Sequence, residues 1–514
     1  MDAKELKSYL KESELDIQNA NAALFLADYI FGFYANSHKL HGVNFSPVCS
    51  YFSYSKLSAF YQIINKKFIV DLSEKIYKNF KKNRKSFEEM VGVHQNLTRK
   101  FDLTWREYQK AKKQGLSEKI LGEFYRKFEN ISRSYWYNAV ACEDKGAIIE
   151  REIIPSFARR NNLSVEKAQN IVTILSHPDE QSVFNFERKE FLQICLLIFQ
   201  KKLIVKTEED IIAQVLGDKE LKNKINSYVR HYFWVKTDFY RATEITKDSL
   251  IKDIIQELKK KSKKEIEKEL LDIDKNFERI GIRKKKILRD SRLKREDMDE
   301  LYFSRKTIYW MDQRKMGMMK NIYYVFSLLG DIAACYDIDY ANIILYSTED
   351  LDRLLLSGRK LDKKILAKRH AGTFMSCERG EITKFFYGNV GEEMFKIATN
   401  VEKKELKGIV ASKGSGGIVR GKVKIVLNPK EISFHTGEIL VTSMTRVEFV
   451  PLMRKARAII TNEGGLACHA AIISRELGIP AIIGTKNATN ILKNGDEIEM
   501  DMKTGEIRVV ILVV

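Results

Sequence analysis

The chain has 514 residues, of which 44% are hydrophobic and 11% aromatic. This apolar content excludes a globally disordered protein, and the length predicts about two to four domains. Lys and Arg number 89 against 69 Asp and Glu, a formal net charge of +20. Because Lys and Glu are interspersed over most of the chain, we interpret the excess as a solvated surface and do not expect a nucleic-acid partner.

The sequence also excludes membrane-spanning or secreted proteins, and proteins held together by disulfides or metal ions. No apolar run approaches the roughly 20 residues of a membrane span, and the start of the chain lacks the apolar core of a signal peptide. The six cysteines are scattered without CxxC spacing, which predicts neither a disulfide framework nor a metal site. We therefore expect a cytoplasmic protein without a membrane partner.

The sequence pattern of the first 400 residues predicts helices. Proline is absent between Asp179 and Asn428, and apolar residues recur with helical spacing from Ile251 to Phe277 and from Leu301 to Ala334. We divide this body into a helical region over 1–245 and a second helical region over 246–400.

The composition and the predicted secondary structure change after residue 401. Glycines become frequent, and short β-type runs alternate with turns, with one convincing helix from Cys468 to Leu477. The polar, then glycine-rich segment Asn400–Ser415 is typical of a hinge. We predict a multidomain fold in which a mostly α-helical N-terminal body precedes a C-terminal α/β domain over 406–514.

The most informative string in that domain runs from Thr461 to Ala481. A β-strand ends in the pair Gly464 and Gly465, and a helix then begins with His469 in its first turn. Unpaired N–H groups and the helix dipole favour an anion there, so a phosphoryl group on the imidazole would be stabilised. The alternative from the residues alone is that His469 merely caps or packs at a strand–helix junction.

This string resembles the motif T-x-x-G-G-x-T/A-S/C-H-A-A-I-x-x-R-E-x-G-I-P-A of the phosphohistidine domain of the phosphoenolpyruvate-utilising enzymes. That family includes phosphoenolpyruvate synthase, pyruvate phosphate dikinase and rifampin phosphotransferase. The flanks resemble the family too, at Gly414–Val423, Gly437–Val441, Gly495–Ile498 and Asp501–Gly505. Two departures are Ala467, where Thr is frequent, and Val447, where Pro is usual. The resemblance implies a swivelling domain of β/β/α type.

The resemblance also implies roles for single residues. His469 would carry a phosphoryl group between two remote sites, with Gly464, Gly465, Cys468 and Arg475 supporting the phosphate. Arg475 could instead be the structural partner of a carboxylate. No metal ligand is implied in this chain.

In the family, the phosphate comes from ATP bound with Mg²⁺ in an ATP-grasp domain. No Gly-rich phosphate loop flanked by strands precedes the hinge, and no barrel that binds phosphoenolpyruvate follows before Val514. We therefore expect no cofactor in this chain, and ATP and Mg²⁺ on a partner subunit of ATP-grasp type.

The helical body has a fainter likeness to the region before the histidine domain in proteins similar to rifampin phosphotransferase. His370, beside Arg369 in an expected loop, could touch a substrate phosphate, which would give both residues a substrate-side role. The alternative is that His370 is a plain surface histidine. Two functions follow. One is a dikinase-type phosphotransferase component, incomplete alone, whose acceptor is pyruvate or another small molecule. The alternative is a catalytically reduced binding or regulatory protein that retains the swivelling domain.

Overall fold

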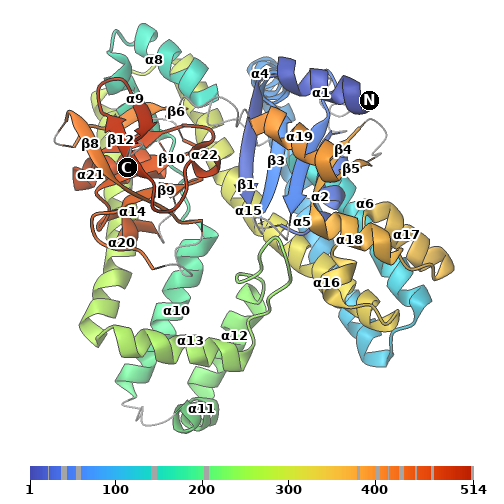
Figure 1. Cartoon of the computed structure of the whole chain (residues 1–514). Helices are drawn as coiled ribbons and strands as arrows, with labels where there is room; N and C mark the ends of the chain where they lie inside the picture. Colours follow the sequence, from blue (N-terminus) through green and yellow to red (C-terminus); the bar gives the residue numbers. More distant parts are fainter. Residues whose placement is uncertain are drawn as a thin grey trace.

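The computed structural model describes residues 1–20, 22–35, 43–53, 59–139, 148–201, 208–378, 383–399, 406–414, 416–427, 433–445, 449–464 and 468–510. The fold is mostly helical, with one five-stranded sheet in the N-terminal body and an eight-stranded sheet in the C-terminal region. Figure 1 shows the two sheets in different parts of the molecule, with helices around and between them.

The five-stranded sheet of the body is antiparallel, with the strand order β1-β3-β2-β4-β5. Its strands are β1 Leu15–Ala20, β2 Val48–Ser53, β3 Ala59–Asn65, β4 Thr373–Cys377 and β5 Thr383–Tyr387. The expectation of a mostly α-helical body is confirmed, and this body also contains a sheet that the sequence analysis did not predict. Because β2 pairs with β4, the two expected regions over 1–245 and 246–400 also share one sheet.

Helices cover both faces of this sheet, as the alternation of side chains along its strands requires. Tyr51 and Ile63 are buried on the face covered by α1 Ala3–Glu12 and α19 Gly388–Thr399. Phe52 and Ile64 are buried on the other face, against α2 Leu24–Ala35. Figure 1 shows α1 and α19 in front of the sheet. We call this sheet, together with α1, α2, α19 and the helix α4 Lys66–Lys82, the sheet lobe.

Further helices, long and short, continue the core of the sheet lobe into the rest of the body. They are α4 Lys66–Lys82, α5 Arg84–Gln114, α6 Glu118–Ala139, η2 Ile149–Ile153, α8 Ile154–Arg160, α9 Val165–Leu175, α15 Arg295–Cys335, α16 Tyr340–Ile343, α17 Thr348–Ser357 and α18 Lys363–Ala371. The helix predicted from Leu301 to Ala334 is confirmed by α15, which has 41 residues.

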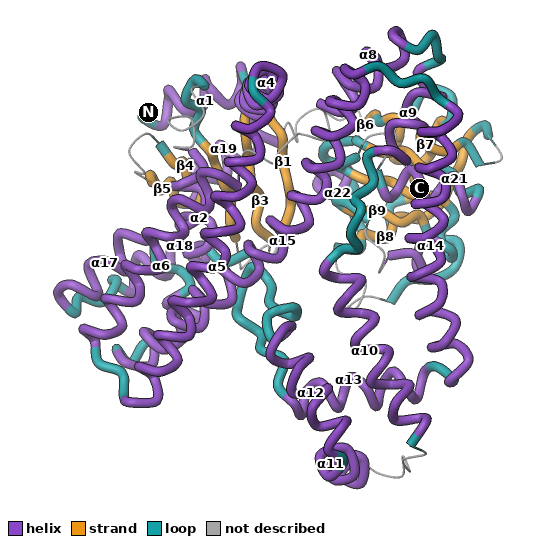
Figure 2. Tube along the Cα trace, turned by 180° about the vertical axis from the view of Figure 1, so that it is seen from behind, coloured by secondary structure: helices purple, strands orange, loops and turns teal. Residues whose placement is uncertain are grey.

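A separate helical arm has its own core. It consists of α10 Val183–Gln200, α11 Glu208–Gly217, α12 Lys219–Tyr232, α13 Lys247–Lys260 and α14 Lys263–Asp290. The apolar stripe predicted from Ile251 onward is buried in that core, and Ser262 caps α14 and separates it from α13. Figures 1 and 2 show the arm extending below the C-terminal domain.

The C-terminal domain contains an eight-stranded sheet with the order β6-β13-β12-β8-β9-β10-β11-β7. Its elements are β6 Leu406–Lys407, β7 Ile409–Ser412, β8 Ile418–Ile425, β9 Ile439–Thr442, α20 Val450–Met453, β10 Ala458–Thr461, α21 His469–Leu477, β11 Ala481–Ile483, α22 Ala488–Ile491, β12 Glu497–Asp501 and β13 Glu506–Val509. The predicted strand-rich C-terminal region is therefore confirmed.

The apolar cores of the C-terminal domain are separate from those of the body. Its two hydrophobic clusters draw only on described residues between Leu406 and Ile507. One polar contact to the body is the hydrogen bond from Asn487 Nδ2 to the carbonyl of Thr399, at 3.3 Å. Among the described residues, no helix has both the length and the apolar character that crossing a bilayer requires.

Candidate functional site

The loop between β10 and α21 lies at one edge of the C-terminal sheet. Strands β8, β9, β10 and β11 run parallel, so their carboxyl ends meet at the same edge. In open α/β sheets, ligands bind outside this edge. The string that carries the predicted site residues leaves β10 there and leads into α21.

Asn462 forms four hydrogen bonds that connect the start of this loop to neighbouring elements of the C-terminal domain. Its backbone N–H donates to Thr442 at the end of β9 (3.1 Å), and its carbonyl accepts from the Lys486 N–H (2.9 Å). Its side-chain Nδ2 donates to Thr489 Oγ1 at 2.6 Å, and its Oδ1 accepts from the Thr489 N–H at 3.0 Å. These four bonds fix the start of the loop between β9 and α22, so it is held in place before any ligand arrives.

Gly464 and Cys468 lie against each other across the loop. Gly464 has a φ of +123°, which side-chain-bearing residues rarely adopt, and a Cβ there would lie 2.6 Å from Cys468 Sγ. Cys468 is the N-cap of α21, and its Sγ accepts from the Ala471 N–H at 3.4 Å. Gly465, the other predicted glycine of the site, lies outside the described residues.

His469 is the first residue of α21, as the sequence predicts. The structure describes its backbone, and its side chain lies outside the described part. At this position a residue stands among the free N–H groups of the first turn, next to the positive end of the helix dipole. Ala470 and Ala471 follow it and are buried against the sheet.

Arg475 is exposed on the second turn of the same helix. Its Nε donates to the carbonyl of Ala471 at 3.1 Å. The role in balancing phosphate charge stays a prediction.

Arg369 and His370 lie on another part of the molecule. They belong to the last turn of α18, so the expectation of a loop was wrong. Arg369 is buried: its Nη1 contacts Asp350 Oδ2 at 2.6 Å and donates to the carbonyl of Leu345 at 2.6 Å. This buried guanidinium stabilises the packing of the helical body through these two contacts. We therefore do not assign it to a substrate site. Both views show α18 far from α21.

A cavity of about 770 Å³ between the sheet lobe and the C-terminal domain was missed by the sequence reasoning. Gly464 is in its wall, together with Asn462 and Glu463 of the same loop. The remaining lining residues come from five other segments: Leu10, Lys11, Ser13, Glu14, Leu15 and Ile17; Lys66; Ala398 and Thr399; Lys407 and Ile409; and Gly484, Thr485, Lys486 and Asn487. Figures 1 and 2 both show β6 and α22 on the side of the C-terminal domain that faces α4 and β1.

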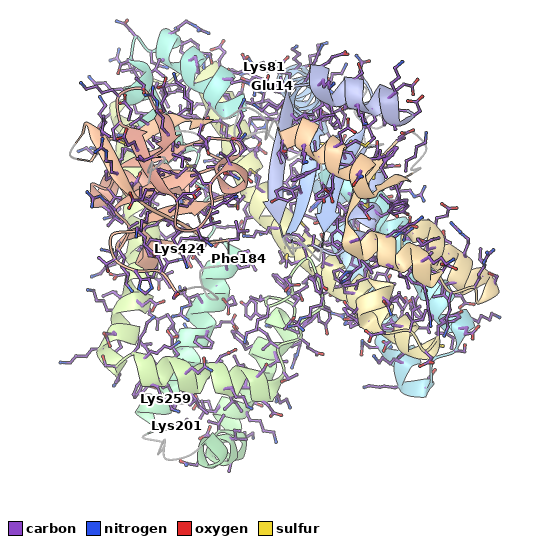
Figure 3. The ribbon with its side chains drawn as sticks, viewed as in Figure 1. Glu14, Lys81, Phe184, Lys201, Lys259 and Lys424 are labelled. Atoms are coloured by element: carbon purple, nitrogen blue, oxygen red, sulfur yellow. The ribbon has the colours of Figure 1, made fainter. Side chains whose placement is uncertain are left out.

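The cavity wall is rich in charge. Four of its residues are lysines and two are glutamates. The Glu14 carboxylate contacts Lys66 Nζ at 2.8 Å, and this hydrogen bond and the Lys66 charge lower its pKa. The charge of Lys486, from the other side of the cavity, lowers the pKa of Glu14 further. Figure 3 places Glu14 on the side of the sheet lobe nearest the C-terminal domain.

No group of three or more His, Cys, Asp or Glu side chains that could hold a metal ion occurs in the part of the chain that the structure describes. The described site thus consists of a glycine-containing loop, a helix start and a lysine-lined cavity.

Comparisons with known proteins match the C-terminal domain. The family model of the PEP-utilising enzyme, mobile domain, matches residues 434–505. A probable phosphoenolpyruvate synthase of Archaeoglobus fulgidus is 49% identical over 114 residues, which is 21% of this chain and 15% of that protein. The phosphoenolpyruvate synthase of Aquifex aeolicus is 45% identical over 116 residues, 22% of this chain and 14% of that protein.

These relatives are much longer than the matched segment. The chain spans only about one-seventh of their length. Among solved structures, the holo form of aconitase X from Thermococcus kodakaraensis is 20% identical, with 21% of this chain and 98% of that chain covered. Its TM-score is 0.17, so we draw nothing from it.

Proposed function

We propose, from a C-terminal region that carries the mobile domain of PEP-utilising enzymes, that this chain is a phosphotransferase component with His469 as its phosphoryl carrier. The single observation that carries the proposal is the position of His469 as the first residue of α21, directly after the loop of Gly464 and Cys468. The start of α21 supports this proposal, because the free N–H groups of a first helical turn favour a phosphoryl group on the residue there.

The chemistry follows from the helix start. A neutral imidazole nitrogen of His469 attacks the phosphorus of the donor, an N–P bond forms, and the P–O bond to the leaving group breaks. The free N–H groups of α21 and its dipole stabilise the negative phosphoryl oxygens. The guanidinium of Arg475 adds positive charge on the same helix.

A carrier must visit two sites, and the packing of the C-terminal domain is compatible with such motion. Its hydrophobic clusters are its own, so rotation would expose little of its core. The prediction of a hinge over Asn400–Ser415 was wrong where β6 Leu406–Lys407 and β7 Ile409–Ser412 form part of the C-terminal sheet. Residues 400–405 of the predicted hinge lie outside the described residues, and this segment joins the domain to the body. We propose rotation about this segment.

We place the donor site, with ATP and Mg²⁺, on a separate ATP-grasp subunit. The reason is that the sequence before residue 406 holds no Gly-rich phosphate loop flanked by strands. The acceptor is pyruvate or another small molecule, held against the body. His469 is the part of this machinery that the chain itself supplies.

The test is phosphorylation of the purified chain. We would incubate it with labelled ATP alone, with labelled ATP plus an ATP-grasp protein, and with labelled phosphoenolpyruvate, and then search for acid-labile phosphate. We expect label only when a competent donor is present, and none in His469→Asn. Labelling by ATP alone would overturn the separate ATP site.

A second function is a binding or regulatory protein that retains the domain without catalysis. The observation that favours it is Ala467, which lacks the hydroxyl frequent at this position of the motif and lies outside the described residues. Absence of label from every donor would support this second function.

A further inference from the structure

We infer that the cavity between the sheet lobe and the C-terminal domain binds a small organic anion bearing a carboxylate or phosphate group. This inference rests on the proposed function in one respect, namely that the anion is the phosphoryl acceptor. Binding itself depends only on the cavity and its charges.

The charges of the cavity wall favour an anion. Lysines outnumber glutamates there by four to two. Lys66 is paired with Glu14 and Lys407 with Glu506, the latter at 3.6 Å. Among the described residues, Lys11 and Lys486 have no carboxylate within ion-pair distance, although both line the cavity. Their ammonium groups are therefore available to a ligand.

The two available lysines come from opposite walls. Lys11 lies in the last turn of α1, in the sheet lobe, and Lys486 follows β11 in the C-terminal domain. The backbone N–H of Lys486 donates to Asn462, which holds this residue beside the site loop. An anion between Lys11 and Lys486 would connect the two walls, so binding would favour the docked position of the domain.

The size of the cavity limits the ligand. A volume of about 770 Å³ lies in the usual range of small-molecule sites and is too small for a folded partner. Ser13, Thr485 and Asn487 supply polar groups, and Leu15, Ile17 and Ile409 supply apolar ones. This combination suits a small organic molecule with one anionic group.

The cavity also adjoins the loop that carries the chemistry. Gly464 lines it, and Cys468, the N-cap before His469, touches Gly464. If the bound anion has a hydroxyl, that oxygen attacks phosphohistidine, the O–P bond forms and the N–P bond breaks. The released imidazole nitrogen takes the hydroxyl proton, which balances the step.

Binding to the full chain can be measured by titration calorimetry with inorganic phosphate, pyrophosphate and pyruvate as probes. We expect at least one probe to bind wild type, and Lys11→Gln and Lys486→Gln each to weaken it about tenfold, the loss of one charged hydrogen bond. The matched controls are Lys4→Gln on α1 and Lys503→Gln in the C-terminal domain. Both are exposed and outside the cavity wall, and should bind as wild type does.

Glu14→Gln keeps the result interpretable if a lysine variant folds poorly. It removes a negative charge from the cavity and releases Lys66, so the affinity should rise, a change that damage to the fold would not produce. Failure of all three probes to bind wild type, or unchanged affinity in both lysine variants and in Glu14→Gln, would overturn the inference.

The experiments distinguish failure of the carrier function of His469 from failure of the anion site. His469→Asn should retain binding of the probe although it cannot be phosphorylated. If labelling of wild type fails but binding follows the lysine pattern, the carrier function is wrong and the anion site stands. If labelling succeeds and the lysine pattern is absent, the anion site is wrong and the carrier function stands.

Discussion

The Sγ atom of Cys468 occupies the space in which a side chain on Gly464 would begin, because a Cβ at Gly464 would lie 2.6 Å from it. Gly464 also has a φ of +123°, so both its backbone and its surroundings require glycine. Because Cys468 is the N-cap of α21, this contact joins the described end of the segment after β10 to the start of the helix that carries His469.

Gly464→Ala should therefore disturb the loop. We expect a loss of about 1–3 kcal/mol in the free energy of unfolding from the strained backbone, and a larger relative loss in phosphorylation of His469. The matched control is Gly437→Ala, where φ is +93° and no heavy atom lies within 4 Å of the added Cβ. Thermal unfolding and the labelled fraction would be measured together. Equal labelling of both variants would contradict the role of the contact.

Arg369→Gln tests the structural role of Arg369. Its ion pair with Asp350 joins two side chains that are each 4% exposed, so removing one partner should cost about 3–5 kcal/mol. The matched control is the next residue, the exposed His370, and His370→Gln should leave the stability within about 0.5 kcal/mol of wild type. Chemical denaturation at neutral pH checks both. A destabilising effect of His370→Gln equal to that of Arg369→Gln would contradict this assignment.

The same ion pair predicts a dependence on pH. Burial raises the pKa of Asp350, but the charge of Arg369 and hydrogen bonds from Ser347 outweigh burial and hold that pKa below its ordinary value. The pair thus contributes fully above the unfolded pKa of about 3.9, and its contribution is lost as the pH falls through the lower folded pKa. The difference in unfolding free energy between wild type and Arg369→Gln should therefore shrink on acidification. A constant difference down to acidic pH would speak against it.

Asn487→Ala tests how the C-terminal domain is docked. The variant loses the hydrogen bond to Thr399, so the undocked population should rise about fivefold, as expected for about 1 kcal/mol. Thr489→Val is the control, because it breaks the hydrogen bond to Asn462 inside the domain and leaves the one to Thr399 intact. Energy transfer between dyes on α4 and β12 would report the populations. The same population in Asn487→Ala as in wild type would contradict docking through this bond.

The fold was predictable where one segment contains its own pattern. The short β-type runs expected after residue 401 include β9 Ile439–Thr442, and the helix expected from Cys468 to Leu477 is α21 with Cys468 as its cap. The five-stranded sheet was missed because β2 and β4 are separated by more than 300 residues. The β-type composition of Val48–Ser53 could have indicated a strand, but no local pattern reveals such a distant partner.

The site was predictable to the same extent. The string from Thr461 to Ala481 contains the loop and helix start in one stretch, so the position of His469 follows from it. The cavity could not be predicted, since Lys11 and Lys486 look like surface lysines until the fold places them on opposite walls of one cavity. Arg369 is the opposite case, a residue that the sequence wrongly suggested for the site. Its position beside His370 in an expected loop does not indicate that it contacts the buried carboxylate of Asp350.

The most direct test of the carrier function is to locate the phosphate. The full chain would be charged by a donor, either phosphoenolpyruvate or ATP with an ATP-grasp protein, digested without acid, and sequenced by mass spectrometry. We predict one phosphoryl group on His469 of the peptide that begins α21, transferable to an added acceptor and absent from His469→Asn. Phosphate on any other residue, with His469→Asn charged as fully as wild type, would contradict it.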